Sequence, residues 1–446
     1  MKIFFSGIGG SGVSAIAGFM AEKGNCVAGS DRLFDEIPSH PLRMKLQKQG
    51  IAILPQNGQG IDSACDLTVF STSVERSNPD FIRSLELGIP MKSRPDYLSE
   101  IVSCYKTVAV AGTSGKSTTS GMLAFLMERL GLSPNFIGGG RVKQFRNMRN
   151  AGNYLSGSSE TLIIEACESD GSIVNYRPEH SLILNLELDH HSVSETAGMF
   201  ERLADNTRGL VLVNADDRNL SACSISGGRG FSIYADSDYK AAAISCQAMS
   251  TSFQVNGQDF RLSLPGEYNL CNALACISFL SEIGTKARDI AEVLPEFEGI
   301  ERRFDIHLDD GRYMVIDDYA HNPHKLASLM AAMKKISQRI CYIFQPHGFG
   351  PTRLMKDGYI RTFVENLRPS DHLILLPIYY AGGTAAKDIS SSDLAAGIAA
   401  AGRSVEVITE RSEVLERTGI WDCYVVAGAR DDTLSDLAGQ IAGKLG

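Results

Sequence analysis

The chain has 446 residues and a composition that is ordinary for a globular protein, with 43% hydrophobic and 21% charged residues. Its formal net charge of −9 argues against a protein that binds nucleic acid, because such proteins carry a basic stripe. We therefore expect no nucleic-acid partner. An acidic chain that binds phosphates must do so locally, through backbone N–H groups, a few Lys or Arg side chains and a metal ion. The length predicts about two to four domains.

The N-terminal segment lacks a basic stretch followed by a long apolar run, and no apolar segment is long enough to cross a membrane. The ten cysteines form no C-x-x-C pair and no array with zinc-ligand spacing, which is typical of reduced thiols. These features predict a cytoplasmic protein without a membrane partner. The oligomeric state stays open between a monomer and a homodimer.

The first motif is a G-x-G-x-x-G pattern made by Gly7, Gly9 and Gly12, which lies between an apolar run and a helix-like stretch. Glycines let such a turn approach a pyrophosphate, and the following helix offers free N–H groups to the anion. Asp31, after the next apolar step, can accept from a ribose hydroxyl. The motif predicts a site for a diphosphate-bearing nucleotide. A nicotinamide cofactor and a ligand-free turn are the alternatives at this point.

Short apolar runs alternate with helix-length segments along almost the whole chain, which predicts an α/β fold with mainly parallel sheets. The expected strands cover residues 3–5, 67–70, 107–110, 162–164, 182–184, 210–213, 314–316, 340–344, 372–375 and 423–426. Changes of pattern near residues 103 and 308–312 predict three domains, at residues 1–103, 104–307 and 308–446.

A second glycine loop, Gly112-Thr113-Ser114-Gly115-Lys116-Ser117, follows the expected strand at 107–110 and precedes a helix. It differs from a strict phosphate loop because Val110 stands at the place of the first glycine. The functional groups of a phosphate loop are present. Backbone N–H groups can bind phosphates, Lys116 can reach the β and γ oxygens, and the Ser117 hydroxyl can bind Mg²⁺. Two nucleotide loops in one chain favour a nucleotide-tagged substrate that meets ATP.

Acidic and histidine side chains follow two of the expected strands. Glu165 lies in EACESD and His190 in NLELDHHS, at positions where α/β proteins place ligand sites. A carboxylate and a histidine close to a triphosphate are suitable Mg²⁺ ligands. The alternative is that Glu168 and Asp170 are helix N-caps and that His191 is a solvated loop residue.

These stretches, together with GEYNLCNALA, ERRF, DDYAHNP and FQPH further along, resemble in their order the Mur ligases of peptidoglycan synthesis. The resemblance covers nearly the whole chain. It implies a Rossmann-like domain for a UDP-sugar, a central domain like those of P-loop ATPases, and a Rossmann-like C-terminal domain that closes over ATP and the amine. GIGGSGVSAIA, followed by Ser30 and Asp31, is similar to the branch that joins L-alanine to UDP-N-acetylmuramate and to the branch that recycles a muramyl tripeptide. The first loop is then expected to hold a UDP-sugar diphosphate.

The resemblance implies that the substrate carboxylate attacks ATP to give an acyl phosphate, which an amine then converts to an amide. Lys116, Glu165, His190 and Arg303 are the expected catalytic residues, with Mg²⁺ on Ser117, Glu165 and His190. The implied UDP-sugar contacts are Gly9, Gly10, Ser11, Gly12, Ser30, Asp31, Ser71 and Arg94. The implied ATP contacts are Gly112, Thr113, Ser114, Gly115, Lys116, Ser117, Thr118, Asn269, Asn272, Arg303 and Asp318. Tyr319, His321, His347 and Arg353 are expected on the side of the amine.

The chain departs from the L-alanine-adding branch at three places. Ser114 and Tyr268 stand where that branch has histidines, and Gly348 and Pro351 stand where it has arginines, so that only Arg353 is left there. The loss of these arginines favours an alternative in which the amine acceptor is not plain L-alanine or is bulkier than L-alanine. Two further hypotheses are a nicotinamide oxidoreductase, which leaves the second loop unexplained, and a non-catalytic Mur-like binding protein, which leaves the acidic set unexplained.

Overall fold

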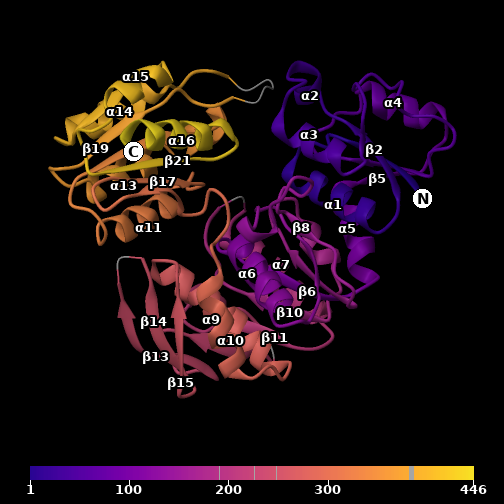
Figure 1. Ribbon diagram of the computed structural model, residues 1–446, viewed down its shortest axis with the longest axis horizontal. Coiled ribbons are helices and arrows are strands. Elements are labelled where there is room, and N and C mark those ends of the chain that lie inside the picture. The colour runs from indigo at the N-terminus through magenta and orange to yellow at the C-terminus, as the bar shows by residue number, and fades with distance from the viewer. Residues whose placement is uncertain (190, 226, 248, 381–385) are drawn as a thin grey trace. The chain divides into compact units, whose positions relative to one another are not determined.

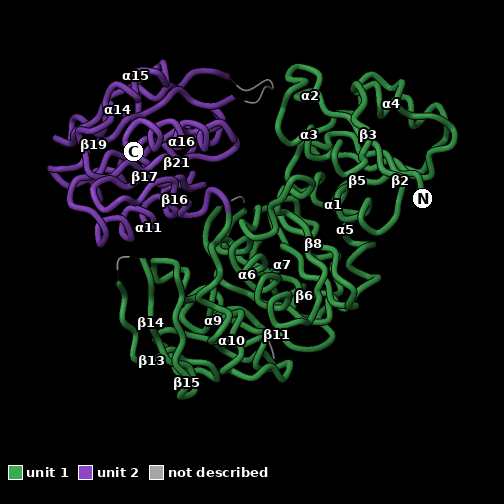
Figure 2. The backbone as a smooth tube through the Cα atoms, viewed as in Figure 1, with its two compact units in different colours: residues 1–300 green, residues 301–446 purple. Residues whose placement is uncertain are grey.

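The computed structural model describes residues 1–189, 191–225, 227–247, 249–380 and 386–446. It is a mixed α/β structure with three sheets, as the alternation of strands and helices predicts (Figure 1). The chain divides into two compact units, residues 1–300 and residues 301–446 (Figure 2). The expected boundary between residues 307 and 308 falls inside strand β16 (Asp305–Asp309) of the second unit.

The first sheet has five strands in the order β3-β2-β1-β4-β5, and all its pairings are parallel. The strands are β1 (Lys2–Ser6), β2 (Cys26–Ser30), β3 (Ala52–Ile53), β4 (Leu67–Phe70) and β5 (Met91–Ser93). The helices are α1 (Ser11–Glu22), α2 (Arg32–Glu36), α3 (Pro41–Lys48), α4 (Pro79–Glu86) and α5 (Arg94–Ser103). Because parallel strands end at one edge, the loops after β1, β2 and β4 gather there.

The second sheet has ten strands in the order β15-β14-β13-β12-β11-β10-β6-β9-β7-β8. Its strands are β6 (Lys106–Ala111), β7 (Asn135–Ile137), β8 (Tyr154–Leu155), β9 (Thr161–Glu165), β10 (His180–Ile183), β11 (Val211–Asn214), β12 (Arg229–Ser232), β13 (Tyr239–Cys246), β14 (Thr251–Val255) and β15 (Gln258–Leu262). The pairings are parallel except for β7–β8 and the antiparallel run β13–β14–β15. The helices are α6 (Lys116–Arg129), η1 (Lys143–Phe145), η2 (Ser172–Asn175), α7 (Val193–Asn206), α8 (Arg218–Ser221), α9 (Glu267–Glu282), α10 (Ala287–Val293) and η3 (Leu294–Glu296).

The third sheet belongs to the second unit and has the order β16-β17-β21-β18-β19-β20, with only the β16–β17 pair antiparallel. The remaining strands are β17 (Met314–Asp318), β18 (Ile340–Gln345), β19 (His372–Leu375), β20 (Val405–Val407) and β21 (Cys423–Gly428). The helices are α11 (Pro323–Met333), α12 (Phe349–Leu354), α13 (Lys356–Asn366), α14 (Ser391–Ala400), α15 (Arg411–Glu416) and α16 (Thr433–Leu445).

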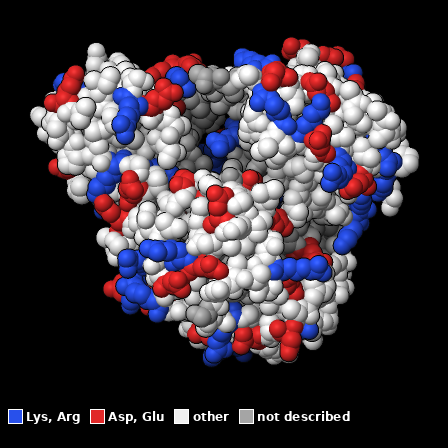
Figure 3. Space-filling model, turned by 180° about the vertical axis from the view of Figure 1, so that it is seen from behind, with Lys and Arg blue, Asp and Glu red and all other residues white. Residues whose placement is uncertain are grey.

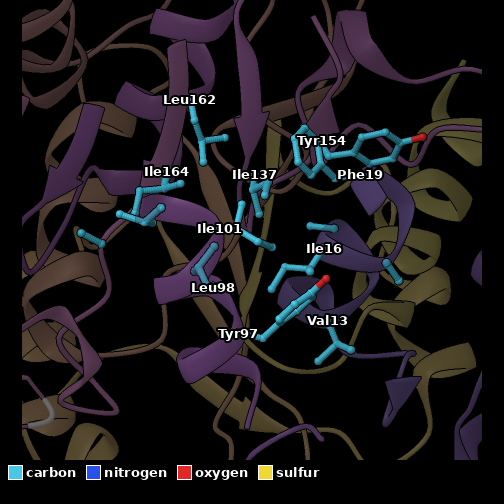
Figure 4. Packing of buried hydrophobic residues seen from close by; sticks show 14 of the residues in the cluster. Val13, Ile16, Phe19, Tyr97, Leu98, Ile101, Ile137, Tyr154, Leu162 and Ile164 are labelled. Atoms are coloured by element: carbon cyan, nitrogen blue, oxygen red, sulfur yellow. The ribbon is translucent and has the colours of Figure 1, made fainter. Parts of the chain in front are cut away.

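One hydrophobic cluster joins the first two sheets. Val13 and Ile16 of α1 and Leu98 of α5 belong to the same buried cluster as Leu162 and Ile164 of β9 (Figure 4). Burying such side chains stabilises a fold by about 1.5–3 kcal/mol each. The first two sheets therefore share a core, and this core fixes α1 and α5 relative to the central sheet.

The surface carries both signs of charge. On the face drawn in Figure 3, Lys and Arg side chains are interspersed with Asp and Glu side chains. The described part of the chain contains no helix with the length and apolar character needed to span a membrane. The ten cysteines are all free thiols in the structure.

Candidate active site

The first glycine loop leads from β1 into α1. Gly10 precedes the helix without a capping side chain, so the first N–H groups of α1 are available to an anion. Asp31 accepts a hydrogen bond from the N–H of Gly9 at 2.8 Å and another from Leu33 at 3.0 Å, where it caps α2. A Cβ on Gly9 would lie 2.8 Å from the Asp31 carboxylate, so glycine is required for this approach.

Arg94 lies at the start of α5, beside this loop. A Cβ on Gly12 would lie 3.5 Å from Cδ and 3.8 Å from Nη1 of Arg94, so the guanidinium runs along the first turn of α1. Its Nη2 forms an ion pair with Asp170, which lies in the turn between β9 and η2. The structure thus places Gly9 beside Asp31 and Gly12 beside Arg94, and the anion site itself stays a prediction.

Two other predicted contact residues, Ser30 and Ser71, interact with protein groups of the first sheet's part of the chain. The Ser30 side chain is fully buried and donates to the carboxylate of Asp80, which also accepts from Ser6 at 2.8 Å and from the N–H of Gly58 at 2.9 Å. Ser71 packs against Gly7: a Cβ on Gly7 would lie only 2.6 Å from the Cβ of Ser71. Asp80 is a residue that the sequence analysis missed. Its only sequence signal is its place after Asn78-Pro79, which begin α4.

The second glycine loop lies between β6 and α6. Gly112 and Gly115 have φ angles of +146° and +85°, which favour glycine. Asn185 holds the loop: its Oδ1 accepts from the Ser114 N–H at 2.7 Å, and its Nδ2 donates to the Ser114 carbonyl at 3.0 Å. The Thr113 hydroxyl accepts from the Glu187 N–H at 2.9 Å. The segment after β10 therefore shapes the loop, a role that the sequence analysis did not assign to Asn185.

Lys116, the first residue of α6, is tied to a buried carboxylate. Its Nζ lies 2.8 Å from Oε2 of Glu168 and 2.5 Å from the carbonyl of Gly112, and the Glu168 side chain is only 3% exposed. Burial lowers the pKa of Lys116, but nearby Cys167 and Glu168 outweigh it, so this pKa lies above its ordinary value. Lys116 is therefore a permanent cation inside the phosphate loop.

Ser117 and Glu165 form the adjoining pair. The Ser117 hydroxyl donates to Oε2 of Glu165 at 3.0 Å, while Oε1 accepts from the N–H groups of Gly139 at 2.8 Å and Gly140 at 3.1 Å. A hydroxyl and a carboxylate held this close are the oxygen ligands that Mg²⁺ prefers, so these residues fit the expected metal. The expected third ligand, His190, lies outside the described residues. Among the residues that are described, no three His, Cys, Asp or Glu side chains form a group that could hold a metal.

The start of α9 lies against the phosphate loop. A Cβ on Gly115 would lie 2.5 Å from Oδ1 of Asn272, so the predicted Asn272 borders the loop directly. Asn269 is also buried, but its Nδ2 donates to the carbonyl of Pro265 at 2.7 Å and so closes the first turn of the helix. Thr118 is buried within α6, one residue beyond Ser117.

Two consecutive arginines lie at the start of the second unit, and Arg303 is the one predicted as a site residue. Arg302 is buried and contacts Asp317 at 3.2 Å and the carbonyl of Gly428 at 2.8 Å, so it is part of the core of this unit. Arg303 instead lies over the ring of Tyr319, 4.8 Å from its centroid. The two oxygens of Asp318 accept from the N–H groups of Phe304 at 2.7 Å and Ala320 at 2.7 Å. Burial raises the pKa of Asp318, although Arg303 acts in the opposite direction.

Three predicted residues form a chain of ring contacts after β17 and β18. His321 lies 5.6 Å from Tyr319 and 5.2 Å from His347, measured between ring centroids. Nδ1 of His321 lies 2.9 Å from the Tyr319 carbonyl, and because a carbonyl only accepts, this nitrogen carries the hydrogen. Burial, together with Lys325 and His347, lowers the pKa of His321 to about 3. The ring is therefore neutral at physiological pH.

The departures after FQPH have a structural explanation. Gly348 has φ +68°, and a Cβ there would lie 3.2 Å from Cδ of Pro351, so the two residues fit each other. An arginine at position 348 would be strained on this backbone. Arg353 contacts Asp388 through Nε at 3.0 Å and donates to the carbonyl of Ala386 at 3.1 Å. Its guanidinium is thus already engaged by protein groups.

Comparisons with known proteins cover nearly the whole chain. Three family models match in chain order: the Mur ligase family catalytic domain at residues 2–106, the Mur ligase middle domain at 110–280 and the Mur ligase glutamate ligase domain at 302–430. A UDP-N-acetylmuramate–L-alanine ligase from Caldicellulosiruptor saccharolyticus is 30% identical over 433 residues, which are 93% of this chain and 92% of the relative. The chain belongs to the Mur ligase family.

A second such ligase, from Syntrophotalea carbinolica, is 32% identical over 415 residues, with 90% of this chain and 88% of the relative covered. The crystal structure of the UDP-N-acetylmuramate–alanine ligase from Thermotoga maritima has a TM-score of 0.82 at 26% identity and covers 100% of this chain and 99% of that one. A murein peptide ligase from Psychrobacter arcticus, with a TM-score of 0.73 and 22% identity over 100% and 99% of the two chains, shares the fold.

The resemblance inferred from the motifs is therefore confirmed, and this Mur ligase is an ATP-dependent ligase. The phosphate loop with Lys116 and Ser117 lies in the part matched by the middle-domain model, and so does Glu165. The three glycines at 138–140 are further site residues that the sequence analysis missed, although their run in the sequence was a usable signal. A Cβ on Gly140 would lie 2.9 Å from the Cβ of Ser117.

Proposed function

We propose that this Mur ligase joins the carboxylate of UDP-N-acetylmuramate to the amino group of L-alanine, with ATP converted to ADP and phosphate. The observation that carries the proposal is the pairing of Lys116 and Ser117 of the phosphate loop with Glu168 and Glu165. It supplies a fixed cation and an oxygen-ligand pair beside a loop built for phosphates. The names of the relatives support the choice of the UDP-sugar and of L-alanine.

In the proposed reaction, a carboxylate oxygen attacks the γ-phosphorus and ADP leaves, which gives an acyl phosphate. The amine then attacks the acyl carbon, and phosphate leaves with that carboxylate oxygen while the amine loses a proton. Lys116 stabilises the charge on the β and γ oxygens. Ser117, Glu165 and His190 would hold Mg²⁺, which neutralises phosphate charge when bound.

The remaining assignments extend this proposal. Arg303 contacts the γ-phosphate, Asn272 and Asn269 face the adenine, and Asp318 faces the ribose. Tyr319, His321, His347 and Arg353 serve the amine. For Asp318 and Arg353, ligand binding must compete with the backbone N–H groups and with Asp388, respectively.

A second candidate differs only in the amine. Gly348 and Pro351 stand where the L-alanine-adding branch has arginines, and the φ of +68° at Gly348 makes this backbone suited to glycine. The second candidate is thus a ligase that joins a peptide, or another amine, to the same UDP-sugar.

The test is the release of phosphate from ATP by the whole chain with Mg²⁺, UDP-N-acetylmuramate and one amine at a time. The amines are L-alanine, glycine, L-serine and L-alanyl-γ-D-glutamyl-diaminopimelate, and omission of the UDP-sugar is the control. Release with L-alanine alone supports the proposal, and release only with the tripeptide or another amine supports the second candidate. No release with any amine would overturn both.

A further inference from the structure

Three carboxylates within six residues connect the two anion-binding loops of the first unit. Glu165 accepts from Ser117, Glu168 pairs with Lys116, and Asp170 pairs with Arg94. The first two partners belong to the phosphate loop of the central sheet, whereas Arg94 lies beside the glycine loop of the first sheet. Asp170 is thus the only one of these three carboxylates whose partner borders the other loop.

The Arg94–Asp170 pair is largely shielded from solvent and built on fixed elements. The two side chains are 21% and 18% exposed. The second oxygen of Asp170 accepts from the N–H of Ser172 at 3.0 Å, at the start of η2. Ser99 of α5 donates to the carbonyl of Asn175 in η2 at 3.4 Å, so the elements that carry the two partners are packed together.

The Arg94 guanidinium lies between Asp170 and the start of α1. Nη2 contacts Asp170, while Nη1 and Nε lie 3.8 and 4.0 Å from the place where a Cβ on Gly12 would be. An arginine has five N–H donors in a rigid fork, so one edge can hold a carboxylate while the other serves an anion. The pair with Asp170 is made through Nη2, and the guanidinium has further N–H donors for an anion at the first turn of α1.

We propose that Asp170 is a positioning residue for the UDP-sugar: it holds the Arg94 guanidinium beside the first turn of α1, where its remaining N–H donors bind the diphosphate. This rests on the proposed function, in that the glycine loop binds the UDP-sugar. Asp170 touches no substrate and acts through Arg94. A carboxylate from the turn after β9 thereby supports the nucleotide site of the first sheet.

The test measures binding of UDP-N-acetylmuramate to the full chain by calorimetry, with Asp170→Asn and Arg94→Ala alone and together. Asparagine keeps the oxygen that accepts from Ser172 and removes only the charge, so the fold is retained. We expect each single variant to weaken binding by about 5- to 20-fold, and the double variant to be no weaker than Arg94→Ala. Glu100→Gln, which removes the Lys92 ion pair on the same helix, is the matched control and should bind as the wild type does.

Steady-state kinetics separate positioning from a general structural effect. For Asp170→Asn, KM for the UDP-sugar should rise by the same factor, while kcat and KM for ATP stay within about twofold of wild type. Unchanged or tighter UDP-sugar binding by Asp170→Asn, or additive losses in the double variant, would overturn the inference. If the wild type itself fails to bind the UDP-sugar, the proposed function fails instead, which distinguishes the two.

Discussion

At the scale of single residues, the site is organised by charges that are buried together. Lys116 and Glu168 are the clearest case, because the lysine of the glycine loop pairs at 2.8 Å with a carboxylate that is only 3% exposed. Removing one partner of such a pair leaves the other charge unpaired in a buried place, which costs more than the pair contributes.

We therefore expect Lys116→Met to abolish ATP turnover and also to lower the free energy of unfolding by roughly 3 kcal/mol. Adding Glu168→Gln to Lys116→Met should restore most of the stability but none of the activity. Urea unfolding and phosphate release measure the two effects separately. Equal stability of the single and double variants would contradict the pairing.

The pH dependence of stability provides a second residue-scale prediction. The pKa of His321 is about 3 in the folded chain and about 6.5 when unfolded, so the unfolded chain binds more protons between these values. Stability is then complete above pH 6.5 and falls with decreasing pH by at most about 1.4 kcal/mol per unit.

Asp317 acts in the opposite direction, because its pKa, raised to about 6 mainly by burial, makes the folded state the better proton binder. Asp317 is present both in the wild type and in His321→Asn, so a comparison of these two proteins cancels the contribution of Asp317. Asparagine can keep the donor near Nδ1. The difference in unfolding free energy between the two proteins should shrink steadily from pH 6.5 toward pH 4, and a constant difference would contradict the assignment.

Much of the site could be predicted from the sequence, because the site depends on local patterns. Lys116 and Ser117 follow directly from the strand–glycine loop–helix order, and Glu165 from its place at the end of a strand. The partners of Arg94 and Ser30 could not be predicted this way, since Asp170 and Asp80 are distant in sequence and only the fold brings them near. Asp318 was expected to face a ribose, and the backbone bonds that occupy it were not foreseen.

At the scale of elements, the ten expected strands are all present, because buried parallel strands read as continuous apolar runs. The antiparallel run β13–β14–β15 was missed, since its strands are polar on one face. The Asn256-Gly257 pair, with φ values of +49° and +80°, was the available signal for the β14–β15 hairpin.

The turn from β18 into α12 gives an element-scale prediction. Gly348→Ala places a Cβ on a backbone with φ +68° and should lower stability by about 1–2 kcal/mol. Gly350→Ala is the matched control, because it lies within α12 and a Cβ there meets nothing within 4 Å. That control should be neutral or slightly stabilising, by about 0.4–1 kcal/mol. Thermal unfolding compares them, and equal effects would contradict the role of Gly348.

At the scale of the whole molecule, the cores decide which parts can fold alone. The cluster that contains Val13, Leu98 and Leu162 belongs to both of the first two sheets (Figure 4), whereas residues 301–446 form a compact unit. Motifs along the chain suggested a boundary near residue 103 but held no information about this shared core, because contacts between distant segments leave no local pattern.

We expect the fragment 301–446 to unfold cooperatively on its own, and the fragment 1–300 to do the same. The fragment 1–103 should instead lack a cooperative transition, because its helices α1 and α5 lose part of the core against which they pack. Circular dichroism during urea unfolding checks this. Cooperative unfolding of 1–103 with the stability of 1–300 would contradict the shared core.

In the proposed reaction, the substrate carboxylate is activated by phosphate from ATP before the amine attacks. The most direct measurement follows ¹⁸O from the carboxylate of UDP-N-acetylmuramate during turnover with ATP, Mg²⁺ and L-alanine. Mass spectrometry of the phosphate should find one ¹⁸O per amide formed, because phosphate leaves with the oxygen that attacked. Amide formation with unlabelled phosphate would contradict the acyl phosphate and require another route.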